Sequence, residues 1–282
     1  MRILLTGAGG QLGQALQRVL AAEAVAALTH AELDITDSQA VGRAVEIHRP
    51  EWIVNVAAYN LVDEAEGQAD AAFQVNALGV LHLAQAARAA GSTLVHFSTD
   101  YVFDGFKNTP YTETDLPNPL SVYGLSKLSG EILLRGGTPK YFLIRSCGLY
   151  GWPTNPRRDN FVERLLAAAR AGQPLRVVSD QVLTPTSASE LAEKVVPLVR
   201  TGRYGLYHMT NEGQCSWYEF AQEIFRLAGF SPTLEAVTLA DYGARAQRPR
   251  YSVLENRAYA ELGLPSFRPW QEALADTMRQ RG

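Results

Sequence analysis

The chain has 282 residues, of which 46% are hydrophobic and 20% charged, and its formal net charge at pH 7 is −3. This length predicts about two domains, or one large α/β unit with an appended lobe. Because acidic and basic residues are mixed along the chain, the composition excludes a nucleic acid or an acidic membrane surface as partner and favours a small soluble molecule.

The cysteines and the apolar segments bear on the compartment. Cys147 and Cys215 are isolated and lack CxxC spacing, which argues against a disulfide framework or a zinc site. The first apolar run is too short for a signal peptide, and no run of about 18 apolar residues occurs elsewhere. The histidines show no ligand spacing such as HxxxH, so no metal site is predicted. We therefore expect a cytoplasmic protein.

A glycine-rich turn near the N-terminus carries the first functional signal. Residues 2–6 form an apolar run that predicts a strand, and the turn that follows leads into a helical pattern from Leu12. Strand, glycine turn and helix is the context of a dinucleotide-binding fingerprint. Gly7 permits a tight turn, Gly10 lets backbone N–H groups approach a pyrophosphate, and Gly13 lets the helix pack close to the strand. The GxxGxxG spacing is a variant of GxGxxG, and a common structural turn is the alternative.

The next predicted strand, residues 25–29, ends where a Rossmann unit meets the adenosine ribose. Thr29 and His30 stand there instead of an acidic residue, so NADH and NADPH both remain open. Asp34 lies further on, where it could contact the adenine. The alternative is a loop aspartate preceding Asp37, which is predicted to cap the next helix.

Two buried parallel strands are predicted at residues 52–57 and 93–97, with a long helix over 69–90 between them. Tyr59 lies just after the first of these strands, at the carboxyl edge where ligands bind in an open α/β sheet. The helix carries Asn76 in its apolar face. This amide needs a hydrogen-bond partner if it is buried, and a position on the helix surface is the alternative.

Three side chains suited to proton transfer come from two predicted elements. The strand at 93–97 delivers Thr99 to the carboxyl edge, and a helix predicted over 121–134 carries Tyr123 and Lys127. Four residues apart, Tyr123 and Lys127 share one helix face. An ammonium beside a phenol favours the phenolate and lowers its pKa from about 10.

The strand–helix alternation loosens after a last strand over 141–145. The further predictions are a loop over 152–158, a helix over 161–171, capping boxes at Ser187–Glu190 and Ser216–Glu219, and a strand over 204–209. The expected fold class is α/β, a Rossmann-type doubly wound parallel sheet with a smaller C-terminal substrate lobe. We expect a dinucleotide-binding domain over 1–146 and mostly substrate lobe over 147–282, with segments near 180–210 returning to the first domain.

A group of arginines surrounds Pro249 near the C-terminus. Arg245, Arg248 and Arg250 could clamp a phosphate bidentately. A solvated basic loop is the alternative, and it is preferred when the segment is considered without its fold.

The glycine turn, Ser98-Thr99-Asp100 and Tyr123-x-x-x-Lys127 occur in the order typical of the extended short-chain dehydrogenase/reductase family, which the chain resembles across most of its length. Longer motifs are similar to the subfamily that reduces the C4 ketone of a dTDP-linked 6-deoxy-4-ketohexose. These motifs are Val56-Ala57-Ala58-Tyr59-x-x-Val62-Asp63-x-Ala65-Glu66, Ser98-Thr99-Asp100-Tyr101-Val102-Phe103-Asp104-Gly105, Tyr123-Gly124-x-Ser126-Lys127-x-x-Gly130-Glu131, Asp180-Gln181-x-x-x-Pro185-Thr186 and Arg248-Pro249.

The resemblance implies a reduction that yields dTDP-L-rhamnose, with hydride from NADPH or NADH. It implies that Tyr123 donates a proton to the C4 oxygen, that Lys127 lowers the pKa of Tyr123 and holds the nicotinamide ribose, and that Thr99 hydrogen-bonds the ketone. The implied cofactor-binding residues are Gly7, Gly10, Gln11, Leu12, Gly13, Asp34, Ile35, Ala57, Ala58, Tyr59, Asn76, Tyr123 and Lys127. The implied substrate-binding residues are Thr99, Asp100, Tyr101, Phe103 and Arg248, with Tyr101 and Phe103 facing the sugar and Arg248 at the diphosphate.

The chain departs from the resemblance at two places. Gly148 stands where well-known members carry a tryptophan, so contact with the sugar is expected to differ. Gln14 and Ala15 stand where some members have a glutamate that joins a metal-linked dimer. No metal is therefore predicted, while a homodimer stays open.

Two other functions compete with a ketosugar reductase. One is a nucleotide-sugar epimerase or dehydratase of the same fold, which would keep its nicotinamide bound and recycle it. The other is a non-catalytic, nucleotide-binding regulatory subunit similar to the β subunit of methionine adenosyltransferase. The intact set of Thr99, Tyr123 and Lys127 argues against the regulatory subunit.

Overall fold

The computed structural model describes residues 1–152 and 160–280. Most of the loop predicted over 152–158 therefore lies outside the described residues. No helix in the described part of the chain is long and apolar enough to cross a membrane.

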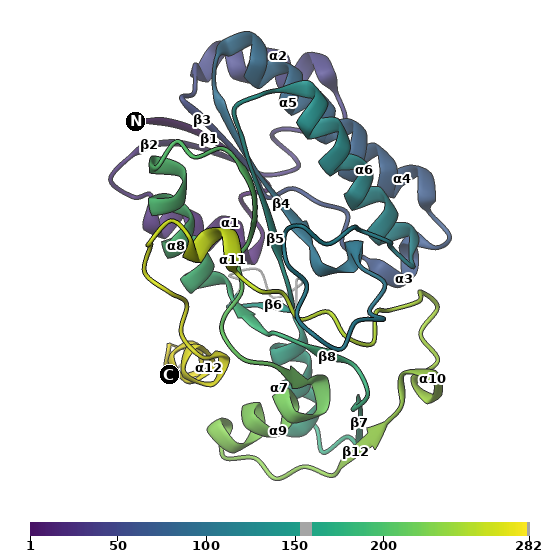
Figure 1. The fold of residues 1–282 in the computed structure, drawn as a ribbon. Coiled ribbons are helices and arrows are strands. Elements are labelled where there is room, and N and C mark those ends of the chain that lie inside the picture. Colours follow the sequence, from purple (N-terminus) through teal and green to yellow (C-terminus); the bar gives the residue numbers. More distant parts are fainter. Residues whose placement is uncertain (153–159, 281–282) are drawn as a thin grey trace.

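A six-stranded parallel sheet forms the centre of the molecule (Figure 1). In spatial order its strands are β2 (Ala24–Leu28), β1 (Arg2–Thr6), β3 (Trp52–Asn55), β4 (Thr93–Thr99), β5 (Tyr141–Ser146) and β10 (Gly205–His208). The order reverses between β1 and β3, which is the switch point where doubly wound sheets bind ligands at their carboxyl edge. The Rossmann-type α/β class predicted from the sequence is confirmed.

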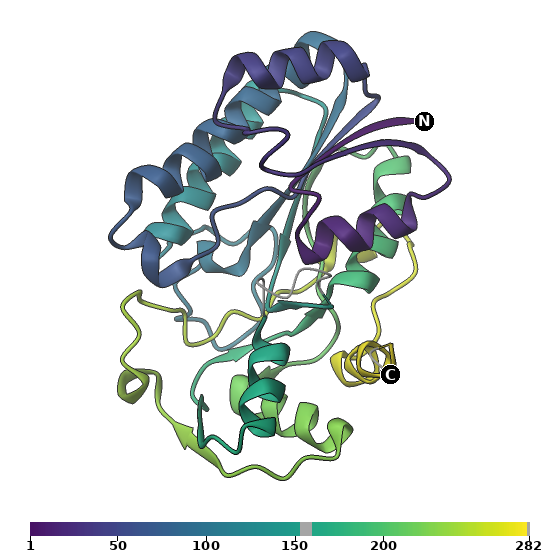
Figure 2. The same ribbon diagram turned by 180° about the vertical axis from the view of Figure 1, so that it is seen from behind.

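Helices cover both faces of this sheet (Figure 1; Figure 2). One face carries α1 (Gln11–Val19) and α8 (Ala188–Arg200), and the other carries α2 (Ser38–His48), α5 (Gly79–Ala90) and α6 (Val122–Gly137). The residues of β1 are continuously apolar because both faces of the strand are buried. Ile3 and Leu5 pack beneath α1 and α8, whereas Leu4 packs beneath α2 and α5.

The helix predicted over 69–90 is interrupted, which the sequence did not indicate. It consists of α4 (Ala69–Phe73), a π-helical turn over Gln74–Leu78, and α5. Asn76 lies in the π turn, and its carbonyl oxygen lies against α6, where a Cβ built on Gly130 would be 2.0 Å away. Such turns are frequent at functional sites because they re-aim individual groups.

The second lobe lies beyond the carboxyl ends of the central strands (Figure 1). It is built from β6 (Leu149–Tyr150), α7 (Phe161–Arg170), β7 (Leu175–Val178), β8 (Val182–Leu183), β9 (Thr186–Ser187), β11 (Cys215–Ser216), α9 (Trp217–Ala228), β12 (Leu234–Val237) and α10 (Leu239–Tyr242). Its core contains Tyr150, Phe220 and Trp270. The capping box predicted at Ser216 and Glu219 is present and begins α9. The short α11 (Arg257–Ala260) follows and packs against β10.

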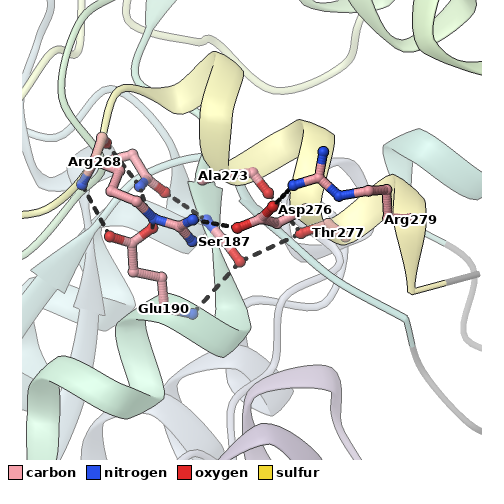
Figure 3. Close-up of polar contacts among 8 residues, drawn as sticks. Ser187, Glu190, Arg268, Ala273, Asp276, Thr277 and Arg279 are labelled. Atoms are coloured by element: carbon pink, nitrogen blue, oxygen red, sulfur yellow. Dashed lines mark hydrogen bonds and ion pairs between the residues drawn. The ribbon is translucent and has the colours of Figure 1, made fainter.

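One buried carboxylate holds the chain just before the C-terminal helix α12 (Trp270–Arg279) against α8 (Figure 3). Glu190 of α8 accepts from the Arg268 backbone N–H at 2.9 Å and from Asn211 Nδ2 at 2.9 Å. The capping box predicted at Ser187 and Glu190 is therefore only half formed. Ser187 Oγ does accept from the Glu190 N–H at 3.5 Å, but the carboxylate is not returned to Ser187 because Arg268 and Asn211 occupy it.

Candidate active site

The glycine turn is pressed against the end of β3. Gly7 has a φ of +70°, and a Cβ there would lie 2.5 Å from the Ala57 nitrogen. A Cβ on Gly13 would lie 2.7 Å from the Gly7 carbonyl oxygen. A side chain at either position would separate the turn from the strand or from α1. Glycine is therefore required here by close backbone approach.

The N-terminus of α1 has the properties of an anion site. Gly10 is its N-cap, and no side chain among the described residues caps the first N–H groups. Orphan N–H groups and the positive end of the helix dipole together favour a phosphate. The turn therefore fits a dinucleotide pyrophosphate.

Gln11 and Leu12 offer their backbones to this site rather than their side chains. Gln11 Nε2 donates to the Leu149 carbonyl at 3.1 Å, and its Oε1 accepts from Asn160 Nδ2 at 3.2 Å. Leu12 is 6% exposed and belongs to the core. Gln11 thus connects the glycine turn to the second lobe.

The loop after β2 holds the residues predicted at the adenine. Asp34 is exposed, and its Oδ1 accepts from the Thr36 N–H at 2.9 Å, which lowers its pKa. Ile35 is buried and packs against Gly79. Asp37 caps α2 as predicted, by accepting from the N–H groups of residues 39 and 40. Asp34 therefore shapes the turn, and its contact with an adenine stays a prediction.

Glu32 is an acidic residue at the end of β2 that the sequence analysis missed. Its Oε2 accepts from the Thr29 N–H and from Thr29 Oγ1, both at 2.8 Å. The turn places this carboxylate beside the strand end, although Glu32 stands three residues further along the chain. An acid three positions after a predicted strand end is the signal that could have identified it.

Two buried amides hold the end of β3. Asn55 Oδ1 accepts from Thr6 Oγ1 at 2.7 Å and from the Ala57 N–H at 3.1 Å. Asn76 Oδ1 accepts from the Tyr59 N–H at 2.9 Å, and Asn76 Nδ2 donates to the Tyr59 carbonyl at 2.9 Å. Asn76 is thus buried with its partner, so the surface alternative is wrong. Its side chain positions the segment that contains Ala57, Ala58 and Tyr59.

Thr99 and Tyr123 are brought together by a close approach of backbones. Residues Asp100–Val102 form a 3₁₀ turn directly after β4. A Cβ on Gly124 would lie 2.3 Å from the Tyr101 carbonyl oxygen, so the first turn of α6 rests on this 3₁₀ turn. The Thr99 hydroxyl is close enough to the Tyr123 phenol to lower the pKa of Tyr123.

Two side chains secure the beginning of α6. Ser121 Oγ accepts from the Gly124 N–H at 3.1 Å, which caps the helix. Glu66 Oε1 accepts from the Val122 N–H at 2.9 Å. The carboxylate also opposes the positive end of the helix dipole. Glu66 is part of the resemblance motifs, but its role at the helix end appears only in the structure.

Lys127 is buried, with 2% of its surface exposed, and its Nζ donates to the Phe97 carbonyl at 2.7 Å. Burial lowers the pKa of Lys127 to about 8, and the charge of Glu131 opposes this change. Glu131 accepts from Ser98 Oγ at 2.6 Å and pairs with Arg145 Nη2 at 2.6 Å. This buried pair fixes α6 against β4 and β5.

The pKa of Tyr123 corrects one expectation. Burial raises it above the ordinary value, the charges of Asp100 and Tyr101 raise it further, and the nearby Thr99 hydroxyl opposes them. Lys127 is not among the described groups that set this pKa, because its ammonium is held at the Phe97 carbonyl. The predicted lowering is therefore absent in this structure. Tyr123 is neutral at pH 7, as a proton donor must be.

Two of the expected substrate-binding residues are enclosed by protein. Asp100 is 4% exposed, and its Oδ1 accepts from Thr99 Oγ1 at 3.1 Å. Phe103 is fully buried and stacks on Tyr111 with ring centroids 4.1 Å apart. The structure corrects the expectation for Phe103, which enters a closed apolar cluster after the 3₁₀ turn. Asp100 contacts Thr99, and its own contact with the substrate stays a prediction. Tyr101 remains partly exposed.

The arginines around Pro249 do not converge on one point. The Arg248 guanidinium pairs with Asp63, while a Cβ on Gly67 would lie 2.9 Å from the Arg245 guanidinium. Arg250 is exposed. A joint phosphate clamp of the three side chains is therefore not what the fold assembles.

Gly148 has a φ of +53°, and a Cβ there would lie 2.7 Å from Leu183 Cδ1 and 3.2 Å from Pro185 Cα. This backbone does not accept a tryptophan. Among residues 1–152 and 160–280, no group of His, Cys, Asp and Glu side chains could hold a metal ion.

Comparison with known proteins decides the family. The family described as RmlD substrate binding domain matches residues 1–281. The chain belongs to this family. A dTDP-4-dehydrorhamnose reductase of Aggregatibacter actinomycetemcomitans is 40% identical over 97% of each chain. A dTDP-4-keto-6-deoxy-D-glucose reductase of Streptomyces niveus is 39% identical, over 97% of this chain and 95% of its own length.

One solved structure is similar to this chain over almost its whole length. The dTDP-4-dehydrorhamnose reductase of Bacillus anthracis, in complex with NADP, has a TM-score of 0.95 and 36% identity over 99% of each chain. The resemblance that the motifs indicated is confirmed. The similarity extends over both lobes, because 99% of each chain is covered.

Proposed function

We propose that this protein reduces the C4 ketone of dTDP-4-dehydro-L-rhamnose to dTDP-L-rhamnose, with NADPH or NADH as hydride donor, in the synthesis of nucleotide sugars for cell-surface polysaccharides. The observation that carries the proposal is the meeting of Thr99, Tyr123 and Lys127 at the carboxyl edge of the sheet, beside a glycine turn that fits a pyrophosphate. Membership of the RmlD family supports it.

The reduced nicotinamide supplies the hydride when it is bound. Tyr123, which is neutral at pH 7, donates the proton that the C4 oxygen takes up as the carbonyl becomes an alcohol. Thr99 donates its hydroxyl hydrogen to the same oxygen when the substrate is bound, in place of its hydrogen bond to Asp100. Lys127 lies one helical turn from Tyr123 and orients the nicotinamide ribose with its ammonium.

The cofactor is proposed to lie along the edge formed by three chain segments. The glycine turn supplies Gly7, Gly10, Gln11, Leu12 and Gly13 through their backbones. The loop after β2 supplies Asp34 and Ile35 near the adenine, and the end of β3 supplies Ala57, Ala58 and Tyr59. Asn76 acts on the last of these through its two hydrogen bonds to Tyr59.

The decisive experiment mixes the purified protein with dTDP-4-dehydro-L-rhamnose and either NADPH or NADH. We expect loss of reduced-nicotinamide absorbance in step with formation of dTDP-L-rhamnose. An epimerase or dehydratase would change the sugar without net consumption of the nicotinamide. Binding of nucleotide without turnover with either cofactor would point to the regulatory subunit and contradict the proposal.

A second substrate belongs in the same assay because one relative is named for it. The Streptomyces niveus protein is a dTDP-4-keto-6-deoxy-D-glucose reductase. In this chain Gly148 replaces the tryptophan of well-known members, so its contact with the sugar is expected to differ from theirs. Comparison of kcat/KM for the two ketosugars identifies the preferred configuration.

The compartment and the oligomeric state are also proposals. Cys147 and Cys215 are both free and buried, which agrees with a cytoplasmic enzyme in a reducing compartment. A homodimer is tested by light scattering of the purified protein, and a mass of one chain would contradict it.

A further inference from the structure

Arg248 belongs to a loop that packs against the turn after β4. A Cβ on Gly105 would lie 2.7 Å from Pro249 Cα and 2.6 Å from the Arg250 nitrogen. Further along the same loop, Ser252 lies close enough to the buried Asp100 to lower its pKa. The loop therefore rests on both ends of the segment that carries Tyr101.

The two terminal nitrogens of Arg248 are both bound to one carboxylate. Arg248 Nη1 donates to Asp63 Oδ1 at 3.0 Å and Nη2 to Asp63 Oδ2 at 2.7 Å. Nη1 also donates to the Ala246 carbonyl at 3.0 Å, and the Ala246 N–H donates to Asp63 Oδ1 at 2.9 Å. The Arg248 side chain is 16% exposed. Both terminal nitrogens thus hold the loop to α3 (Val62–Ala65), and a diphosphate could bind this pair of nitrogens together only by displacing Asp63.

Beyond the ion pair, the guanidinium lies beside the Tyr101 phenol, and the two groups influence each other's pKa. The Tyr101 ring meets the Tyr123 ring edge to face, with centroids 5.7 Å apart and an interplanar angle of 76°. Contacts therefore run without a break from Asp63 through Arg248 and Tyr101 to Tyr123.

We propose that Arg248, held by Asp63, is a positioning residue that keeps Tyr101 against Tyr123, and that it is not the ligand of the nucleotide diphosphate. This inference rests on Tyr123 as the proton donor in the proposed function. It replaces the role at the diphosphate that the resemblance implied. The two roles of Arg248 differ in the effect of Asp63. If Arg248 positions Tyr101, Asp63 supports catalysis by holding Arg248; if Arg248 binds the diphosphate, Asp63 competes with the substrate for it.

Four variants separate these roles: Asp63→Asn, Arg248→Ala, the double variant, and Arg250→Ala as a matched control from an exposed arginine in the same loop. Each is measured for kcat and KM with the ketosugar, for the Kd of dTDP by calorimetry, and for Tm. We expect each single variant to lower kcat by about 10- to 100-fold, since displacement of a catalytic group by about 1 Å costs this much. The Kd of dTDP should stay within about threefold of the wild type in every variant, because in this proposal the Asp63–Arg248 pair does not contact the diphosphate. The kcat of Arg250→Ala should also stay within about threefold, because Arg250 lies outside this pair.

The double variant should be no slower than the slower single variant, because both substitutions break one connection. The inference is overturned if Arg248→Ala weakens dTDP binding by about tenfold or more while Asp63→Asn keeps kcat or tightens dTDP. It is equally overturned if Asp63→Asn, which is isosteric and tests the Asp63–Arg248 pair even where Arg248→Ala does not fold, keeps the wild-type kcat. Failure of the proposed function is distinguishable, since the wild-type protein would then show no turnover while the dTDP affinities could still be compared.

Discussion

The cofactor edge and the reaction edge of this site are built by different means. At the cofactor edge the glycine turn, the uncapped end of α1 and the end of β3 present backbone groups, and glycines keep them close. At the reaction edge, side chains from distant segments converge on Tyr123 and are buried. Backbone sites depend on shape and tolerate no added volume, whereas the reaction edge depends on the charge and protonation of individual groups.

The largest effect is expected at the reaction edge. Tyr123→Phe should lower kcat by at least about 100-fold, because the variant removes the proton donor. Cofactor affinity should be retained, and both quantities are measured with the ketosugar and by fluorescence titration with NADPH. Tyr101→Phe is the control, since it keeps the ring contact and should lose less. Near-normal turnover by Tyr123→Phe would remove it from the mechanism.

At the cofactor edge, Gly7→Ala should weaken NADPH and NADH binding by about tenfold or more, because the left-handed φ costs about 1–2 kcal/mol in a residue with a Cβ and the new methyl meets the Ala57 nitrogen. Gly91→Ala is the matched control. Its φ of +71° carries the same strain, but no described atom lies within 4 Å of its Cβ. Equal losses of affinity in the two variants would show that the close approach to β3 is unimportant.

Lys127 lies between the two edges, and its burial is expected to lower the free energy of unfolding. Its pKa falls from 10.5 to about 8 on folding, so between these pH values the unfolded chain binds the additional proton. Stability therefore rises as pH increases from about 8 towards 10.5, and below pH 8 the buried ammonium lowers the free energy of unfolding by up to about 3 kcal/mol.

Lys127→Met should abolish turnover yet raise the free energy of unfolding at pH 7 by about 1–3 kcal/mol. Urea titrations at pH 7 and pH 10 measure this difference. The gain should shrink at the higher pH, because the wild-type lysine is then neutral. A gain independent of pH would assign the effect to packing instead of charge.

The smallest effect is expected at Glu32. Its carboxylate lies at the strand end where a 2′-phosphate would approach, so Glu32→Gln should improve NADPH binding relative to NADH by about 3- to 10-fold. The ratio of the two dissociation constants is measured for the variant and the wild type. An unchanged ratio would place the carboxylate away from the ribose.

Much of the cofactor edge was predictable. Strand β1, the glycine turn and α1 follow one another within residues 2–19, and the pairing of Tyr123 with Lys127 needs only one helical turn. These features depend on neighbours close in the chain. The capping of α2 by Asp37 was correct for the same reason.

The errors lie where partners are distant. Phe103 was placed at the sugar, but its ring stacks on Tyr111 in a closed cluster. Glu190 was assigned to a capping box, but Arg268, 78 residues away, takes its carboxylate. Nothing in the local pattern distinguishes an apolar residue that lines a cavity from one that fills the core.

The local sequence established the strand–turn–helix unit, the parallel sheet and the order of Thr99, Tyr123 and Lys127, because steric and hydrogen-bonding preferences over a few residues determine them. Packing between distant segments established which groups carry charge and which pair. Burial of Lys127 lowers its pKa, and Asp63 meets Arg248 across 185 residues of chain. Such properties depend on the surrounding dielectric and on neighbours from other elements, and these exist only once the chain has folded.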